Sequence, residues 1–344
     1  MSFLKKLKII TLFIVISLIS SISHAADPSI IFITESGSSS ATIYANGNMQ
    51  VRLNVLYRDV PSGYEVTQIV IKQAYTNNFL PQDWKVSQIY NGYDGNIETY
   101  RKYQSSATLR NDNQDVTTEQ FYLSTNSSNA DILLCVELNF SNVNGDEYTE
   151  STCNGDKNNG LVHVTTIPEM HYTFDDLDRE TTEVFSQFSH PKLIIYEERF
   201  TLKNNRGIHD VNGCSLKQRP RNLIASYASE KDSNPGLLAH SALFLYEPNQ
   251  GIADQNFQYK RENSRNWESI RWKKAKINTT ESITFAWFNG YPSFGTEVIT
   301  NPKDKIKYCR TVTFRDNYGN SGTINIKRVN PWKDGWGNIY YGFD

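Results

Sequence analysis

The chain has 344 residues, of which 21% are charged and 12% aromatic, and 34 residues are Asn. A chain this rich in Tyr, Phe and Ile is not disordered, and at roughly 150 residues per domain its length predicts two domains. Only 3 residues are Met, and the aromatic and β-branched residues alternate with clusters of Asn, Gly, Asp and Ser. This composition disfavours an α-rich fold and predicts strands joined by turns.

Residues 1–25 have the pattern of a cleaved signal peptide. Lys5, Lys6 and Lys8 precede the apolar run 9–19, and small residues, Ser23 and Ala25, stand at the positions that signal peptidase requires. We therefore expect cleavage after Ala25 and a secreted or periplasmic mature protein. No later run approaches the ~18 apolar residues of a membrane span, and no Cys near the cleavage site could carry a lipid.

Residues 26–168 are predicted to form an acidic N-terminal antiparallel β-sandwich. They contain 8 basic and 16 acidic residues, a net charge of −8, whereas 169–344 contain 24 basic and 21 acidic residues, a net charge of +3. This difference supports a domain boundary near residue 168. Met49, Val51, Leu53, Val55 and Tyr57 alternate with other residues and predict one inward face. Further strands are expected over 66–74, 84–90, 120–123, 131–140, 148–153 and 161–166.

The 131–153 region predicts a hairpin with a defined register. A three-residue loop, 143–145, with Gly145 in the left-handed conformation pairs residues whose numbers sum to 288. Cys135 and Cys153 satisfy that sum and should form a disulfide, on the side of the hairpin that also carries Glu137 and Thr149. The core is left to the alternating apolar residues Leu134, Val136, Leu138 and Phe140.

Residues 169–191 are predicted to be a linker with a short helix. Leu177, Val184, Phe185 and Phe188 have the spacing i, i+7, i+8 and i+11, acidic residues stand at the start, and Pro191 follows. This spacing is typical of a helix of three to four turns.

Residues 192–344 are predicted to form a β-rich C-terminal domain, with strands over 192–202, 242–246, 282–289, 305–315 and 323–329. The last two strands and their Gly-Asn turn form the clearest hairpin. Trp287 in an apolar strand, followed by Cys309 in the strand before that turn, resembles the core Trp and Cys of immunoglobulin-like domains. Cys214 lies 73 residues before Trp287 and Lys307 replaces the expected Tyr, so the resemblance implies layered strands and no function.

The two remaining cysteines, Cys214 and Cys309, should pair by elimination. The chain has 4 Cys, and an even number in an oxidising compartment predicts disulfides with no free thiol. The loop that this bridge closes is long, so the chain-entropy model assigns it about 4 to 5 kcal/mol.

The segment 257–277, FQYKRENSRNWESIRWKKAKI, is the best candidate binding site. It has seven basic and two acidic residues with interleaved aromatics. Basic groups attract phosphate, sulfate or uronate and aromatic faces stack on sugars, so the segment predicts an anionic glycan site. The alternative is two strands with core aromatics and solvated Lys and Arg. The residues predicted to bind are Lys260, Arg261, Trp267, Arg271, Trp272, Lys273 and Lys274.

No motif in the sequence predicts catalysis, a metal or a cofactor. The five histidines of the mature chain, His163, His171, His190, His209 and His240, lack zinc-ligand spacing, and there is no nucleophile elbow. The acidic group at 175–180 could bind a cation but lacks the spacing and the Gly of a calcium loop.

These observations favour an exported, non-enzymatic binding or assembly protein, such as an adhesin, a matrix component or a virulence-associated module. Its expected partner is an anionic glycan or a cell surface rather than a nucleic acid. The two alternatives are a secreted polysaccharide-acting enzyme, which requires two close carboxylates, and a pore-forming toxin component.

Overall fold

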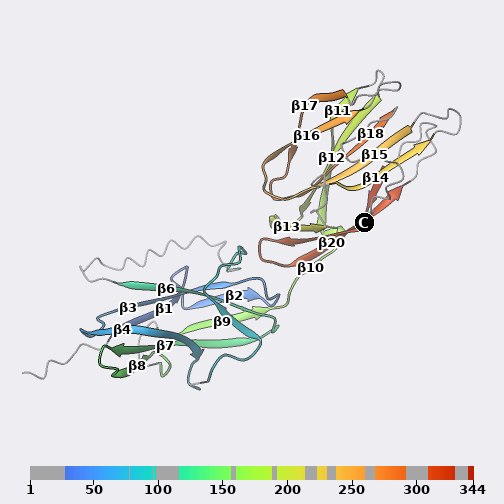
Figure 1. The fold of residues 1–344 in the computed structure, drawn as a ribbon. Helices are drawn as coiled ribbons and strands as arrows, with labels where there is room; N and C mark the ends of the chain where they lie inside the picture. The colour runs from blue at the N-terminus through green and yellow to red at the C-terminus, as the bar shows by residue number, and fades with distance from the viewer. Residues whose placement is uncertain are drawn as a thin grey trace, which may run out of the picture. The chain divides into compact units, whose positions relative to one another are not determined.

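The computed structural model describes residues 28–76, 78–95, 97, 116–155, 160–187, 192–213, 223–230, 238–259, 268–291, 309–329 and 340–344. The described chain is mainly β, with several antiparallel sheets and no α-helix (Figure 1). Within it, no helical segment is long and apolar enough to cross a membrane. The predicted signal peptide lies outside these residues. The chain divides into two compact units: unit 1 is 1–43, 51–90 and 96–166, and unit 2 is 44–50, 91–95 and 167–344.

Unit 1 contains two sheets, which are antiparallel except for β2 and β9. One has the strand order β1-β3-β6-β5, and the other has the order β2-β9-β7-β4, with β8 paired to β7. The His163 N–H donates to the Ser39 carbonyl and the Ala45 N–H to the Ile167 carbonyl, so β2 and β9 run in the same direction. An immunoglobulin-like layout for these sheets remains a prediction. The strands are β1 (Ser29–Thr34), β2 (Ser40–Tyr44), β3 (Val51–Arg58), β4 (Tyr64–Gln73), β5 (Trp84–Ser87), β6 (Thr117–Thr125), β7 (Asp131–Asn142), β8 (Glu147–Ser151) and β9 (Val162–Ile167).

The predicted inward face of β3 is confirmed. Val51, Leu53 and Val55 are fully buried, and Tyr57 at the end of the series is half-buried. Burial of one such side chain stabilises the fold by about 1.5 to 3 kcal/mol, so this alternation fixes which face of the sheet points inward.

The predicted register of the β7–β8 hairpin is also confirmed. Every pair from Glu137↔Ser151 to Ser141↔Glu147 sums to 288, and Gly145 has a φ of +85°. Cys135 and Cys153 form a disulfide, with 4.8 Å between their Cα atoms. Both cysteines are buried in a small cluster with Ala74, so the face of the hairpin that carries the bridge also has a buried part, besides the core face predicted from Leu134 to Phe140.

Unit 2 contains two five-stranded sheets and a two-stranded sheet. The first has the order β10-β20-β19-β13 with β21 paired to β20, the second has the order β11-β12-β18-β15-β14, and β16 pairs with β17. All pairs are antiparallel except β10 with β20. The strands are β10 (His171–Tyr172), β11 (Leu177–Gln187), β12 (Lys192–Leu202), β13 (Ile208–Gly213), β14 (Leu223–Glu230), β15 (Leu238–Tyr246), β16 (Ile252–Tyr259), β17 (Glu268–Asn278), β18 (Ile283–Tyr291), β19 (Thr311–Asp316), β20 (Ser321–Val329) and β21 (Tyr340–Phe343).

The two larger sheets of unit 2 share one hydrophobic core. Phe200 and Phe285 come from one sheet and Phe314 and Ile324 from the other, and all four are fully buried. Trp287 and Cys309, the residues that carry the resemblance to immunoglobulin-like domains, belong to the same core. Cys309 is disulfide-bonded, and its expected partner, Cys214, lies outside the described residues.

The predicted helix after residue 175 is wrong. Residues Leu177–Gln187 form strand β11, preceded only by a single 3-10 turn, η2 (Phe174–Asp176). The pairing of β11 with β12 shifts between Glu183 and Phe185, so Val184 is an extra residue in the strand. A bulge of this kind moves the alternation by one position and gives apolar residues a spacing that resembles a helix.

Candidate binding sites

The predicted basic segment forms the β16–β17 hairpin. Lys260, Arg261 and Trp267 lie in the part of the chain that is not described, whereas Arg271 to Lys274 lie on β17. Among the described strands, β16 and β17 pair only with each other. The backbone of this segment therefore forms two strands, as the alternative to a binding site expected. Two strands do not by themselves exclude a binding surface.

The register of this hairpin contains a large bulge. Gln255 pairs with Ala275 and Phe257 pairs with Ile270, so only Asn256 of β16 stands opposite the four residues 271–274 of β17. These four residues, Arg-Trp-Lys-Lys, are four of the seven predicted to bind. A bulge leaves extra residues outside the ladder and re-aims them, and bulges are frequent beside functional sites.

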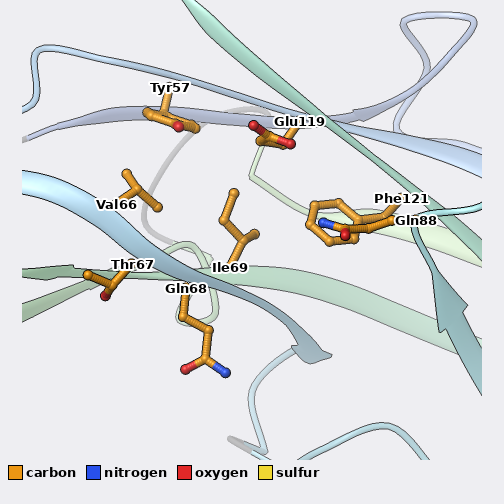
Figure 2. Close-up of a pocket in the computed structure, with 8 residues that line it drawn as sticks. All are labelled: Tyr57, Val66, Thr67, Gln68, Ile69, Gln88, Glu119 and Phe121. Carbon is orange, nitrogen blue, oxygen red and sulfur yellow. The ribbon is translucent and has the colours of Figure 1, made fainter.

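Unit 1 contains a groove that the sequence did not reveal, with a volume of about 370 Å³. Figure 2 shows Val66 and Ile69 of β4 directed toward Tyr57 of β3 and Glu119 of β6, while Thr67 and Gln68 point away. The volume lies within the range of about 300 to 1,000 Å³ that is typical of small-molecule sites. The residues that line this groove are Tyr57, Val66, Thr67, Gln68, Ile69, Gln88, Glu119 and Phe121.

A bulge in β4 shapes the wall of the groove. Val66 pairs with Phe140 and Gln68 with Asn139, so Thr67 is the extra residue. Its hydroxyl donates to the Asn139 carbonyl oxygen over 3.1 Å, and the Gln68 amide oxygen accepts from Asn139 Nδ2 over 3.1 Å. With these two side chains bonded to β7, both Val66 and Ile69 face the groove.

Glu119 is the charged residue of the groove and occupies an inward position. It pairs with Val55, which is fully buried, and Phe121 follows two residues later on the same face of β6. Burial raises the pKa of Tyr57, and the Glu119 carboxylate raises it further, while a hydrogen bond with Thr117 lowers it. A carboxylate and a neutral phenol therefore stand together at one end of the groove.

The sequence contained a signal for Glu119 that the predicted strand boundaries missed. The strand was expected to begin at Gln120, but β6 begins at Thr117. The alternation of Phe121 and Leu123 extends back to Glu119, and this extension alone places a carboxylate on the inward face.

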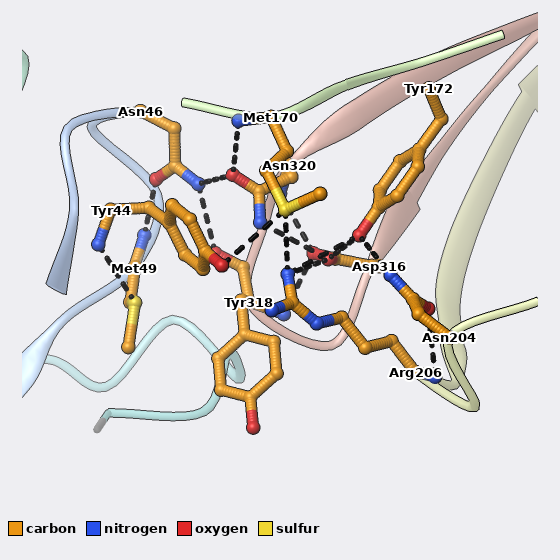
Figure 3. A network of polar contacts seen from close by, with 10 residues as sticks. All are labelled: Tyr44, Asn46, Met49, Met170, Tyr172, Asn204, Arg206, Asp316, Tyr318 and Asn320. Carbon is orange, nitrogen blue, oxygen red and sulfur yellow. Dashed lines mark hydrogen bonds and ion pairs between the residues drawn. The ribbon is translucent and has the colours of Figure 1, made fainter. Parts of the chain in front are cut away.

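A polar network in unit 2 is centred on Asp316, which is fully buried (Figure 3). Its Oδ1 accepts from the backbone N–H groups of Tyr318 (2.9 Å) and Asn320 (2.8 Å). Its Oδ2 accepts from the Tyr172 hydroxyl (2.7 Å) and from Asn320 Nδ2 (3.1 Å), and Arg206 Nη1 lies 3.8 Å away. The network satisfies a buried charge and holds the β19–β20 turn, which is a structural role.

Arg206 and Asn320 extend this network within unit 2. The Arg206 guanidinium carbon lies 5.2 Å from the ring centroids of both Tyr44 and Tyr318. The Asn320 side-chain oxygen accepts from Asn46 Nδ2 and from the Met170 backbone N–H, each over 3.1 Å. The segment 44–50 is therefore bonded to the turn that Asp316 organises.

A second cluster in unit 2 combines aromatic and ionisable groups. The Tyr93 hydroxyl donates to Asp210 Oδ2 over 2.6 Å and accepts from Arg315 Nη1 over 3.2 Å. The His209 ring lies 4.6 Å from the Tyr93 ring, and burial raises the pKa of Asp94 nearby. Arg315 Nη1 also lies 3.7 Å from Asp210 Oδ2, so Tyr93, Asp210 and Arg315 form an ion-pair network.

Two adjacent carboxylates on β12 have opposite environments. Glu198 is almost fully buried and accepts two hydrogen bonds from Arg179 (2.7 and 2.9 Å), one from Thr181 (2.8 Å) and one from Trp287 Nε1 (3.4 Å). Glu197 is also buried, and burial raises its pKa, although a backbone hydrogen bond from Asn278 partly offsets this. Adjacent residues of a strand point to opposite faces, so the two carboxylates do not form an acid–base pair.

The acidic group at the start of β11 has a local structural explanation. Asp176 Oδ2 accepts from the backbone N–H of Thr173 (2.7 Å) and from its hydroxyl (2.9 Å). These hydrogen bonds lower the pKa of Asp176, which caps the 3-10 turn. Among the described residues, no group of three His, Cys, Asp or Glu side chains could hold a metal ion.

The described histidines of the mature chain contact other residues and not one another. His163 contacts Asp131, His171 lies 3.8 Å from Glu169, and His209 packs on Tyr93. His190 is not described, and His240 lies on β15.

Comparison with known proteins gives no family. No protein-family model matches the chain, and no curated protein matches it. Among solved structures, a chain titled BspA_C_WT is 10% identical, aligned over 86% of this chain and 97% of that chain, with a TM-score of 0.19. A likeness at this score carries no argument about fold or function.

Proposed function

We propose that the protein is an exported binding or assembly protein, built from two immunoglobulin-like β units, that recognises an anionic glycan through the β16–β17 hairpin. The observation that carries the proposal is the bulge in β17. It gathers Arg271, Trp272, Lys273 and Lys274 opposite a single residue of β16. An aromatic residue among three basic ones suits a sulfated or uronate-containing sugar, which combines negative charge with an apolar ring face.

The charge distribution of the sequence supports this placement. Residues 257–277 have a local excess of five positive charges, seven basic minus two acidic, whereas residues 26–168 have a net charge of −8. A polyanion is attracted to the first region and repelled by the second. The Cys135–Cys153 disulfide supports an oxidising, extracytoplasmic compartment, where acidic glycans are available.

The test is titration of the full-length mature protein with heparin, polygalacturonate and neutral dextran. We expect binding to the two acidic polymers only, with an affinity that falls steeply as salt is raised, because screening acts over ~10 Å at 0.1 M salt. The double variant Lys273→Glu and Lys274→Glu should weaken binding about tenfold or more without changing the melting temperature. The matched control is Lys85→Glu with Arg310→Glu, an equal charge change at two exposed residues outside the hairpin.

Trp272→Ala separates a binding Trp from a core Trp. We expect weaker binding and an unchanged melting temperature, whereas loss of a core Trp would cost about 3 to 5 kcal/mol of stability. Binding that does not depend on salt, or equal losses in the hairpin and control variants, would contradict the proposed site.

A further inference from the structure

Strand β4 lies at the end of its sheet. Among the described strands it pairs only with β7, and its other edge carries an isolated bridge between Lys72 and Phe79. From Tyr64 to Ile71 the described chain places no strand along that edge. An edge of this kind presents backbone donors and acceptors that can pair with a strand from another polypeptide.

The groove of unit 1 lies beside this edge, because Val66 and Ile69 of β4 form part of its lining. An extended peptide that pairs with β4 directs alternate side chains to one face, as every strand does. The side chains on the groove side would meet the apolar surfaces of Val66, Ile69 and Phe121. Strand addition of this kind takes its affinity from the backbone and its specificity from such a groove.

Glu119 is the charged side chain in the lining of the groove. In the described part of the chain, Glu119 makes no ion pair, whereas the half-buried Glu137 and the buried Glu198 each do. Glu137 pairs with Lys72 at 2.7 Å and Glu198 with Arg179 at 2.7 Å. An inward carboxylate without a cation is stabilised by a cation that a ligand supplies.

The surroundings of Glu119 favour the same class of ligand. The Tyr57 and Phe121 rings line the groove, and aromatic faces attract ammonium and guanidinium groups. Residues 26–168 have a net charge of −8, which attracts a basic segment and repels an acidic one.

We propose that this groove binds an extended segment of a partner polypeptide, which pairs with the edge of β4 that no described strand covers from Tyr64 to Ile71 and places a Lys or Arg side chain against Glu119. This site is separate from the glycan site proposed for the β16–β17 hairpin and takes a ligand of opposite charge. A protein with both sites joins an acidic glycan to a basic polypeptide.

The test uses short capped peptides of alternating Thr and Val with a central Lys, titrated into the full-length protein. A matched peptide carries norleucine in place of Lys, which keeps the length of the side chain and removes its charge. We expect the Lys peptide to bind about tenfold more tightly than the norleucine peptide. Glu119→Gln should abolish that difference without changing the melting temperature, because the substitution keeps the shape of a partly exposed side chain.

Glu65→Gln is the control variant. Glu65 is an exposed acid on β4 outside the groove lining, so its replacement changes the net charge equally and should leave the Lys preference intact. Peptides methylated on alternate backbone nitrogens should lose binding, because they cannot form the strand ladder. The variant Lys273→Glu with Lys274→Glu should bind the Lys peptide as the wild type does, which separates this proposal from the glycan site.

Three results would overturn the proposal. One is that neither peptide binds, and another is that Glu119→Gln keeps the full preference for Lys. The third is that a methylated peptide binds as tightly as its parent. Galactose and mannose serve as probes for a sugar site. If one of them binds, Glu119→Gln abolishes that binding and the Lys peptide does not bind, the proposal is wrong and the groove is a sugar site instead.

Discussion

Replacement of Asp316 with Ala should be among the most damaging single changes in unit 2. Asp316 is fully buried, and its carboxylate accepts four hydrogen bonds at 2.7 to 3.1 Å. Alanine leaves two backbone N–H groups and the Tyr172 hydroxyl without their acceptor in a buried site. Each orphaned donor costs about 1 to 3 kcal/mol, so the total loss should be about 4 kcal/mol after local relaxation.

Two milder variants grade the effect. Asp316→Asn keeps an oxygen that accepts from the two backbone N–H groups, but it places an NH2 group where Asn320 and Arg206 also present donors. We therefore expect about half of the loss in unfolding free energy that Asp316→Ala causes. Tyr172→Phe removes the hydrogen bond that the hydroxyl donates to Asp316 and the two longer ones that it accepts from Asn204 and Arg206 (3.4 and 3.5 Å). The other donors to Asp316 stay in place, so the loss should be about 1 to 2 kcal/mol.

The assay is urea unfolding of the full-length protein, with hydrogen exchange measured on peptides from β19 and β20. The free energy of unfolding should fall while the urea dependence stays constant, and protection should be lost first around the β19–β20 turn. A value for Asp316→Ala within about 1 kcal/mol of the wild type, or a loss of protection confined to the β7–β8 hairpin, would refute the reasoning.

The titration of Tyr172 provides a second measurement. Burial, followed by the hydrogen bond to Asp316, raises the pKa of Tyr172 to about 12, whereas an unfolded Tyr has a value of 10.0. Between these values the folded state retains a proton that the unfolded state loses, so stability should decrease as pH rises through that range. In Asp316→Asn the pKa of Tyr172 should move toward 10.0 but stay above it, because burial remains.

Three further predictions concern other parts of the molecule. Removing the disulfide with Cys135→Ser and Cys153→Ser should cost about 3 kcal/mol, the chain-entropy value for a separation of 18 residues, and hydrogen exchange should increase in β7 and β8. Glu197→Gln should stabilise the protein at pH 7 and have no effect below the unfolded pKa of 4.5, because burial raises the folded pKa of Glu197 and its ionisation opposes folding. Thermal melts of the variant and the wild type across this pH range measure the effect, and a difference in melting temperature that does not change with pH would contradict it. Gly322→Ala should destabilise unit 2 by about 1 to 3 kcal/mol, because its added Cβ would overlap the Phe314 ring and the Tyr172 side chain. An unchanged melting temperature would contradict this packing.

The sequence alone determined the features that depend on neighbouring residues. The inward face of β3 follows from alternation, and the register of the β7–β8 hairpin follows from a turn in which Gly145 adopts a positive φ. Both are local, because a strand has a period of two and a short loop permits few geometries. The Cys135–Cys153 disulfide follows from that register without knowledge of the rest of the fold.

The bulges in β11 and β17 could not be predicted from neighbouring residues. One extra residue in β11 gave Val184 and Phe185 a helical spacing, and the bulge in β17 set Arg271 to Lys274 opposite a single residue. The pairing partner decides whether a residue is extra, and that partner is distant in sequence.

Only the tertiary structure decided the groove and the Asp316 network. Glu119 and Ile69 belong to different sheets, and Asp316 is bonded to Tyr172, a residue from a distant segment of the chain. A single sequence records the residue types but not which of them meet. Sheet packing brings these groups together. In the packed interior a carboxylate loses its hydration, so it is stable only when it accepts hydrogen bonds or pairs with a cation.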